Sequence, residues 1–160
     1  MTSKELCMVE WKMPPKAKVF EALSAVADGR VHLKGPNKAE VSSSTGDRTY
    51  TVRWSDDMKR ISSNDNASHW QGYTGYPIIA VLLVLGKLDF EMETALLLAG
   101  VPWKRINDAF KRDYAMAVDH VLQEVEIKGG NQASIVHEVD SIYKQLAALK
   151  LERGSGKNVK

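Results

Sequence analysis

A polar segment between residues 62 and 71 contains the side chains that hydrolytic enzymes use. Ser68 and His69 are adjacent in it, and Asp65 lies shortly before them. A serine becomes a nucleophile when a base takes its proton, and a histidine held by a carboxylate is the common base. Asp65, Ser68 and His69 therefore define one catalytic hypothesis, in which Asp65 and His69 act as an acid–base pair.

The same segment is also typical of a loop. Serine, asparagine and aspartate bond nearby backbone groups and are favoured where a chain turns, and they make up most of residues 62–71. No G-x-S-x-G pattern surrounds Ser68. The loop interpretation is favoured, and catalysis by this segment is the alternative.

An aromatic stretch follows the polar segment. Trp70, Tyr73 and Tyr76 are spaced three apart, and Gly72 and Gly75 allow tight turns between them. The three rings either cover the start of the next helix as a minor core or form an exposed platform on which bases or a partner's side chains stack.

Basic and aromatic side chains also alternate in the region before this loop. Arg53, Trp54 and Arg60 lie there, and cations that share a face bind phosphates. Asp56 and Asp57 lie among them, which also fits a mixed, solvated surface. The predicted binding residues are Trp70, Tyr73, Tyr76, Trp54, Arg53 and Arg60.

Residues 50–83 resemble a SWIM zinc finger, in which paired strands lead into a C-x-C, a variable loop, and a C-x-H that begins an apolar helix. The four ligand positions of that family fall on Ser62, Asn64, Gly75 and Pro77. None of these replaces a thiolate or an imidazole on zinc. The segment is either a degenerate copy or a generic strand–strand–loop–helix pattern. A degenerate copy would imply the DNA- and protein-binding roles of the family without its zinc.

Other metal-binding patterns are missing from the sequence. The four histidines form neither an H-x-x-x-H pair nor two E-x-x-H pairs, and they are His32, His69, His120 and His137. Cys7 is the single cysteine, which excludes an intramolecular disulfide and a cysteine-rich zinc site. We predict no metal and no cofactor.

The elements that position these residues change type along the chain. Pro14 opens a predicted helix that ends near Gly29. Alternating apolar and polar residues then predict an antiparallel meander of four strands, with turn residues between them. The predicted strands span residues 30–33, 39–43, 49–55 and 59–63.

The second half of the chain has helical patterns. Residues 78–85 are apolar on every side and predict a buried helix, and Asp89 is expected to cap a short helix that ends at Leu98. Residues 102–127 predict one long helix and residues 132–152 a second. The predicted fold class is α+β: an N-terminal helix with a small antiparallel β-meander, a buried helix, and a long C-terminal antiparallel helical hairpin.

Length and composition favour one domain with a real core. The chain has 160 residues, of which 44% are hydrophobic and 26% charged. We expect an α+β core at residues 1–100, a helical hairpin at 101–153 packed on that core or on a second copy, and a disordered tail at 154–160. No apolar run approaches the roughly 20 residues that span a bilayer, and no secretion signal begins the chain, so we expect a cytoplasmic protein without membrane contact.

The last predicted helix carries a heptad seam, formed by Ile135, Val139, Ile142, Leu146 and Leu149. Two broad apolar strips on the hairpin need a third surface to cover them. A second copy would supply it in a four-helix bundle, so we predict a homodimer. The alternative is that the helices at 78–85 and 90–98 supply that surface within one chain.

The net charge is only +2, well below that of many nucleic-acid-binding proteins. The sequence favours a non-enzymatic binding or assembly module that acts on protein or nucleic acid. The alternative is an enzyme of unknown reaction that uses residues 62–71. The sequence identifies neither a substrate nor a partner.

Overall fold

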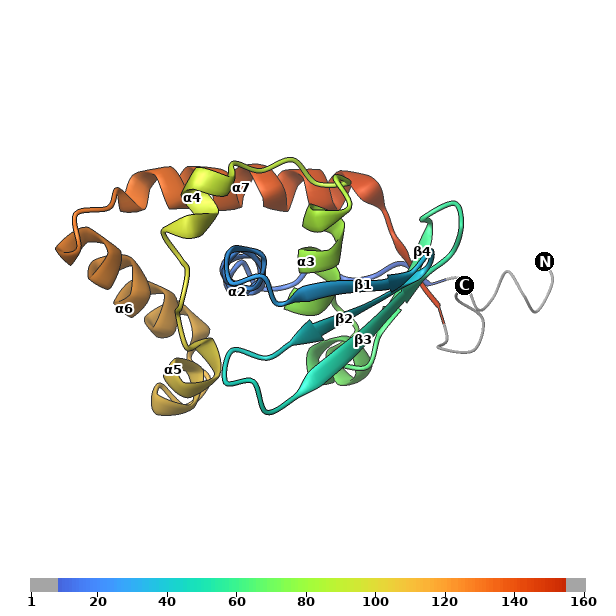
Figure 1. Cartoon of the computed structure of the whole chain (residues 1–160), viewed down its shortest axis with the longest axis horizontal. Helices are drawn as coiled ribbons and strands as arrows, with labels where there is room; N and C mark the ends of the chain where they lie inside the picture. The colour runs from blue at the N-terminus through green and yellow to red at the C-terminus, as the bar shows by residue number, and fades with distance from the viewer. Residues whose placement is uncertain (1–8, 155–160) are drawn as a thin grey trace.

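The computed structural model describes residues 9–154. A five-stranded sheet forms one side of the molecule, α3 packs on the sheet, and α2 packs on α3 (Figure 1). The strands are β1 (Val31–Gly35), β2 (Lys38–Ser42), β3 (Thr49–Trp54), β4 (Arg60–Ser63) and β5 (Glu152–Arg153). The helices are α2 (Ala17–Ala27), the π-helix η1 (Ala67–Gln71), α3 (Tyr76–Val84), α4 (Met92–Leu96), α5 (Trp103–Ala109), α6 (Tyr114–Ile127) and α7 (Gln132–Leu149). The predicted α+β class is confirmed.

The first four strands form the predicted antiparallel meander, in the order β1-β2-β3-β4. Val41, Val52 and Ile61 are fully buried, each with more exposed neighbours along its strand. This alternation is what a sheet with one covered face requires. The side chains on the opposite face, among them Arg53 and Ser62, remain accessible and lie opposite each other in register.

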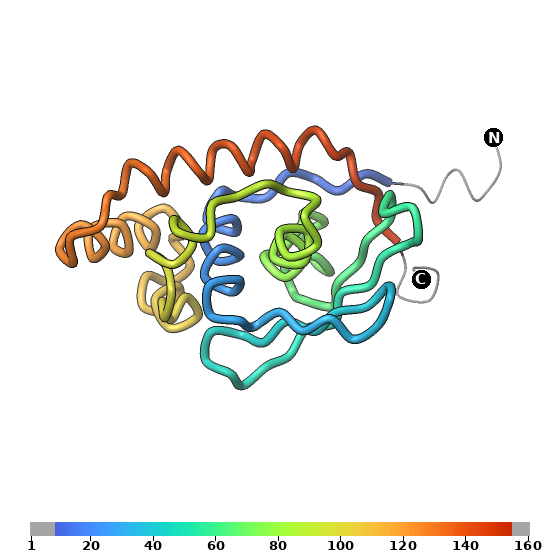
Figure 2. The backbone as a smooth tube through the Cα atoms, turned by 45° about the horizontal axis from the view of Figure 1, so that its top comes forward, coloured from blue at the N-terminus to red at the C-terminus, as the bar shows by residue number. Residues whose placement is uncertain are grey.

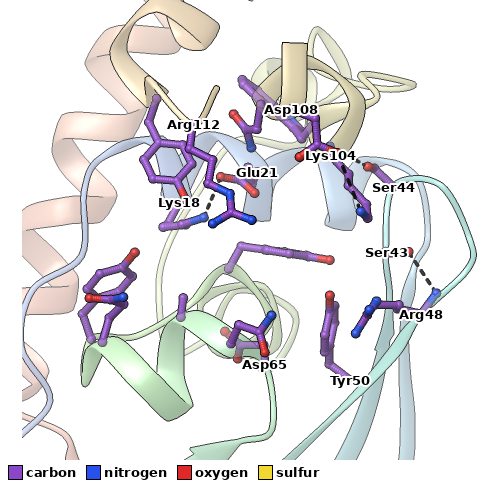
Figure 3. Close-up of a pocket in the computed structure, with 18 of the residues that line it drawn as sticks. Lys18, Glu21, Ser43, Ser44, Arg48, Tyr50, Asp65, Lys104, Asp108 and Arg112 are labelled. Carbon is purple, nitrogen blue, oxygen red and sulfur yellow. Dashed lines mark hydrogen bonds and ion pairs between the residues drawn. The ribbon is translucent and has the colours of Figure 1, made fainter. Parts of the chain in front are cut away.

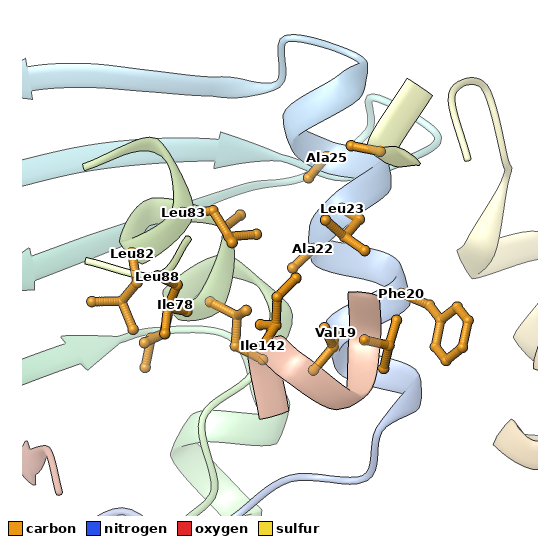
Figure 4. Packing of buried hydrophobic residues seen from close by; sticks show 14 of the residues in the cluster. Val19, Phe20, Ala22, Leu23, Ala25, Ile78, Leu82, Leu83, Leu88 and Ile142 are labelled. Atoms are coloured by element: carbon orange, nitrogen blue, oxygen red, sulfur yellow. The ribbon is translucent and has the colours of Figure 1, made fainter. Parts of the chain in front are cut away.

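The core is built around the contact between α2 and α3. Figure 2 shows these two helices side by side between α7 and the strands. All residues of α3 from Pro77 to Leu83 are buried, as the apolar run predicts. Ala22 and Ala25 of α2 have small side chains that allow the close approach seen in Figure 4, where Ile142 of α7 packs against the same cluster.

One continuous cluster of buried side chains joins the front and back halves of the chain. The seam of α7 takes part in it: Ile135 and Ile142 are completely buried, and Leu149 is the one seam residue that is exposed. Helix α7 packs against α2, α4 and α6. The third surface that the hairpin needs is therefore supplied within one chain.

The prediction of one long helix at residues 102–127 is wrong. Helix α5 ends at Ala109, and α6 begins at Tyr114. Between them Lys111 and Arg112 have φ values of 54° and 66°, in the left-handed region, and Asp113 then caps α6 by accepting a hydrogen bond from the Met116 amide at 3.2 Å. The apolar spacing continues across this turn, so periodicity alone does not reveal the break.

The ends of two other predicted helices also differ. Helix α7 stops at Leu149, because Lys150 is left-handed and the chain then extends into β5, which pairs parallel with β4. Asp89 does not cap α4: its backbone amide instead donates to Gln145 Oε1 at 2.7 Å. Cys7 lies outside the described residues, as does the predicted tail beyond Gly154.

Across residues 9–154, no helix combines the length and the apolar character that crossing a bilayer requires.

Replacing Lys111 with glycine is expected to stabilise the protein by about 1 kcal/mol, because a residue with a Cβ is strained in the left-handed conformation by roughly that amount. Urea unfolding measures the change. The control is Lys144→Gly in the middle of α7, which is expected to destabilise by about 1 kcal/mol. Equal destabilisation by both substitutions would contradict the left-handed turn.

Candidate ligand-binding cleft

A cleft of about 790 Å³ opens at the junction of several distant segments (Figure 3). Its walls are α2, the loop between β2 and β3, the segment that contains η1, and the turn between α5 and α6. Five basic and three acidic side chains line it, an excess of two positive charges. They are Lys18, Arg30, Arg48, Lys104 and Arg112 against Glu21, Asp65 and Asp108.

Three of these cations have carboxylate partners. Lys18 Nζ lies 3.2 Å from Glu21 Oε2, Lys104 Nζ lies 3.8 Å from Asp108 Oδ2, and Arg30 Nε lies 3.3 Å from Asp28.

Arg48 and Arg112 differ from these three paired cations, since neither forms an ion pair with a carboxylate within residues 9–154. Figure 3 shows both side chains directed into the cleft from different walls. The cleft thus presents two guanidinium groups whose charge the described part of the chain leaves uncompensated.

The backbone around each arginine is fixed. Arg112 lies in the left-handed turn, and its amide donates to the Asn107 carbonyl at 2.7 Å. The Arg48 amide donates to Ser43 Oγ at 3.2 Å, and Ser43 Oγ donates to Asp47. Non-glycine residues in strained conformations cluster at functional sites, because other interactions must hold them there. The backbone that carries each cation is therefore fixed, and at Arg112 it is also strained.

Tyrosine and tryptophan side chains form the remaining walls. The rings of Tyr50 and Tyr76 meet edge to face, with centroids 6.2 Å apart. Burial raises the pKa of the hydroxyls of Tyr50, Tyr73 and Tyr76, most strongly at Tyr76. All three hydroxyls therefore remain protonated hydrogen-bond donors near neutral pH. Trp70 lies at the rim with 74% of its surface exposed.

A buried ion pair lies beneath the cleft. Burial raises the pKa of the Glu21 carboxyl, and the nearby Lys18 ammonium offsets this only in part. Burial lowers the pKa of Lys18, but Glu21, Tyr114 and Tyr73 together raise it, so that the pKa lies above its ordinary value. The Lys18 ammonium lies 4.4 Å from the centre of the Tyr114 ring. Asn107 Oδ1 accepts no hydrogen bond from the described residues, whereas Glu21 Oε2 faces the Lys18 ammonium. A buried polar atom without a partner disfavours folding, and a buried carboxyl with a raised pKa is typical of functional sites.

The catalytic hypothesis places three residues together, and the structure unites two of them. Asp65 is buried and accepts hydrogen bonds from the Ser68 hydroxyl at 2.8 Å and the Ser68 amide at 3.0 Å, while Ser68 Oγ accepts one from the Gly75 amide at 3.1 Å. His69 is exposed and its ring lies 4.5 Å from that of Trp70. The Ser68 hydroxyl thus donates to Asp65, and the pair ties the polar loop to the start of α3.

The positions that match zinc ligands in the SWIM pattern hold this loop by other means. A Cβ at Gly75 would collide with the Asp65 carboxylate, so no ligand side chain fits there. Asn64 Oδ1 accepts a hydrogen bond from the Thr51 amide at 2.9 Å. Within residues 9–154, histidine, cysteine and acidic side chains form no group of three that could hold a metal. The resemblance itself stays a prediction.

The predicted binding residues separate into three places. Trp70, Tyr73 and Tyr76 all line the cleft. Trp54 is buried in the core with 4% of its surface exposed, so it is not accessible to a ligand. Arg53 lines a second hollow on the outer face of the sheet, and Arg60 lies on β4 beside it.

The predicted binding residues include neither of the two arginines that carry the cleft, although both belong to stretches of basic residues interleaved with aromatics. Lys18, Glu21 and Tyr114 were not predicted as site residues either. A signal for Arg112 was present, because Asp113 is a favoured N-cap residue and marks the start of α6. No local pattern marks Arg48.

A family profile described as uncharacterised conserved protein UCP014422 matches residues 11–152. The chain belongs to this family. The matched range contains every residue that lines the cleft. No curated protein and no solved structure matches the chain.

Ser68→Ala is expected to destabilise the protein by about 1–3 kcal/mol, because the Gly75 amide and Asp65 lose a buried partner. His69→Ala is the matched control and is expected to change stability by less than about 0.5 kcal/mol, since its side chain is exposed. Urea unfolding of both variants compares them. A Ser68→Ala variant as stable as the wild type would show that the network does not hold the loop.

Proposed function

We propose that the protein is a non-enzymatic binding module whose cleft takes a nucleotide unit, that is, a phosphate group joined to a flat base. The observation that carries this proposal is the pair Arg48 and Arg112, which project into the cleft without a carboxylate partner in residues 9–154. A guanidinium group presents a planar fork of donors that fits phosphate oxygens. Two such groups on fixed backbone supply an anion site.

The aromatic walls of the cleft suit the base of the proposed nucleotide. Tyr50, Tyr73 and Tyr76 line the cleft beside the two arginines, and Trp70 stands exposed at its rim. Bases stack on rings of this kind with little regard to sequence. The protonated tyrosine hydroxyls add donors for phosphate or base oxygens. Phosphate and base thus have separate complementary surfaces within one hollow.

Binding is favoured over catalysis by the arrangement of the polar loop. The Asp65 carboxylate accepts two hydrogen bonds from Ser68, and His69 is exposed with its ring against that of Trp70. No serine–histidine hydrogen bond of the kind that activates a nucleophile is present in residues 9–154. Protein is the other class of partner that the sequence allows, and the two free guanidinium groups favour nucleic acid.

The test compares two neighbouring substitutions in the left-handed turn. Arg112→Gly removes the guanidinium group and the strain together, so it is expected to bind deoxyadenosine monophosphate about 10- to 100-fold more weakly, as the loss of a charged hydrogen bond predicts. Its stability is expected to rise, as in Lys111→Gly. Isothermal titration calorimetry measures binding and urea unfolding measures stability.

Lys111→Gly is the control, because it relieves the same strain but keeps Arg112. It is expected to bind the nucleotide as the wild type does. A wild-type protein that does not bind the nucleotide, or two variants that bind it equally well, would contradict the proposal.

The homodimer predicted from the sequence is a separate proposal. The seam of α7 is covered within one chain, so a dimer needs other apolar residues. Met92 and Leu96 of α4 and Val136 of α7 are exposed, and these two helices pack against each other. If they form the interface, light scattering at tens of micromolar will give a dimer mass, and Leu96→Asp will give a monomer that remains folded. A monomer mass for the wild type would refute the dimer.

A further inference from the structure

A second hollow of about 590 Å³ lies on the other side of the polar loop. Arg53, Arg153 and His69 line it, and no acidic residue among residues 9–154 does. Neither arginine forms an ion pair within residues 9–154. We call this hollow the groove. It resembles the cleft in offering two uncompensated guanidinium groups.

The sheet and the N-terminal segment hold the groove together. Arg53 on β3 lies opposite Ser62 on β4, and Ser62 also lines the groove. Arg153 on β5 lies with its guanidinium carbon 5.0 Å from the centre of the Trp11 ring, which fixes its direction by a cation–π contact. The Trp11 indole is itself held, since Nε1 donates to the Ile61 carbonyl at 2.9 Å.

One segment contributes side chains to both the cleft and the groove, and we call it the ridge. The ridge is the segment of residues 62–71, whose side chains alternate between the two hollows: Asp65 and Trp70 line the cleft, whereas Ser68 and His69 line the groove. The ring of His69 meets that of Trp70 edge to face, and Trp70 is 74% exposed. An exposed aromatic pair therefore stands between two basic hollows.

We propose that the ligand is single-stranded nucleic acid that crosses this ridge. Arg48 and Arg112 bind phosphate in the cleft, Arg53 and Arg153 bind phosphate in the groove, and a base stacks on Trp70 between them. This inference rests on the proposed function of the cleft. It extends that function because a single nucleotide in the cleft cannot also occupy the groove.

Single-stranded nucleic acid is favoured over a duplex because the bases must be accessible. In a duplex they are stacked on one another and paired, so their faces are not free to stack on Trp70, whereas an unpaired strand presents them. The low net charge of +2 is compatible with this ligand, since the basic excess is concentrated at the cleft and the groove.

The test uses a fluorescein-labelled oligodeoxyadenylate of about 12 nucleotides, within the range that one binding domain covers. Fluorescence anisotropy measures its affinity across a series of salt concentrations. The oligonucleotide is expected to bind more tightly than deoxyadenosine monophosphate. The double variant Arg53→Gln/Arg153→Gln is expected to reduce the slope of log affinity against log salt by about 1.4, since each lost contact with a single strand contributes about 0.7.

The same double variant is expected to bind the mononucleotide as the wild type does, because the cleft is intact. Trp70→Ala is expected to weaken oligonucleotide binding about tenfold through the loss of one stacked base. The control is Lys87→Gln/Lys144→Gln, which makes the same change in charge at positions outside both hollows. It is expected to leave the slope close to that of the wild type.

The outcomes separate the two proposals. If the mononucleotide binds in an Arg112-dependent way but the oligonucleotide binds no more tightly, the ridge-crossing strand is refuted and the cleft stands. The ridge-crossing strand is also refuted if the Arg53/Arg153 variant behaves like the lysine control, or if a duplex of equal length binds as well as the single strand. If neither ligand binds, the function proposed for the cleft fails as well.

Discussion

The contact between α2 and α3 is the constraint on which the other features depend. Because α3 is buried along its length and α2 lies between it and the C-terminal helices, polar residues on α2 must find partners inside the protein. Ser24 does so by donating to the Leu98 carbonyl at 2.7 Å and accepting from the Trp103 indole at 2.8 Å. These bonds fix the start of α5, and with it one wall of the cleft.

The same burial explains the ion pair on the preceding turns of α2. Lys18 and Glu21 are both almost inaccessible, so the charge of each is acceptable only beside the other. A pair of well-packed apolar residues would serve stability as well or better. Both side chains also line the cleft, so the pair links the core to the surface of the cleft and makes this part of the cleft wall polar.

The sequence predicted the parts of the fold that local patterns determine. Alternation located β1 to β4, and the unbroken apolar run located α3, because burial on both faces leaves a local signature. It missed the strand at Glu152, because that strand depends on pairing with the distant β4. It also missed the turn at Lys111 and Arg112, because the apolar spacing continues across that turn. The site followed the same rule: the aromatic stretch was recognised, whereas the two arginines come from separate loops and line one cleft only in the folded chain.

The pairing of β5 with β4 has a consequence for synthesis on the ribosome. The Trp11 amide donates to the Leu151 carbonyl at 2.9 Å, and the Arg153 amide donates to the carbonyl of Val9, so the two ends of the described chain close the sheet together. A nascent chain can complete the meander and α3 long before residue 153 emerges. The hollow between Trp11 and Arg153 is assembled last, after translation has passed that point. An unfinished chain therefore carries only one of the two basic surfaces.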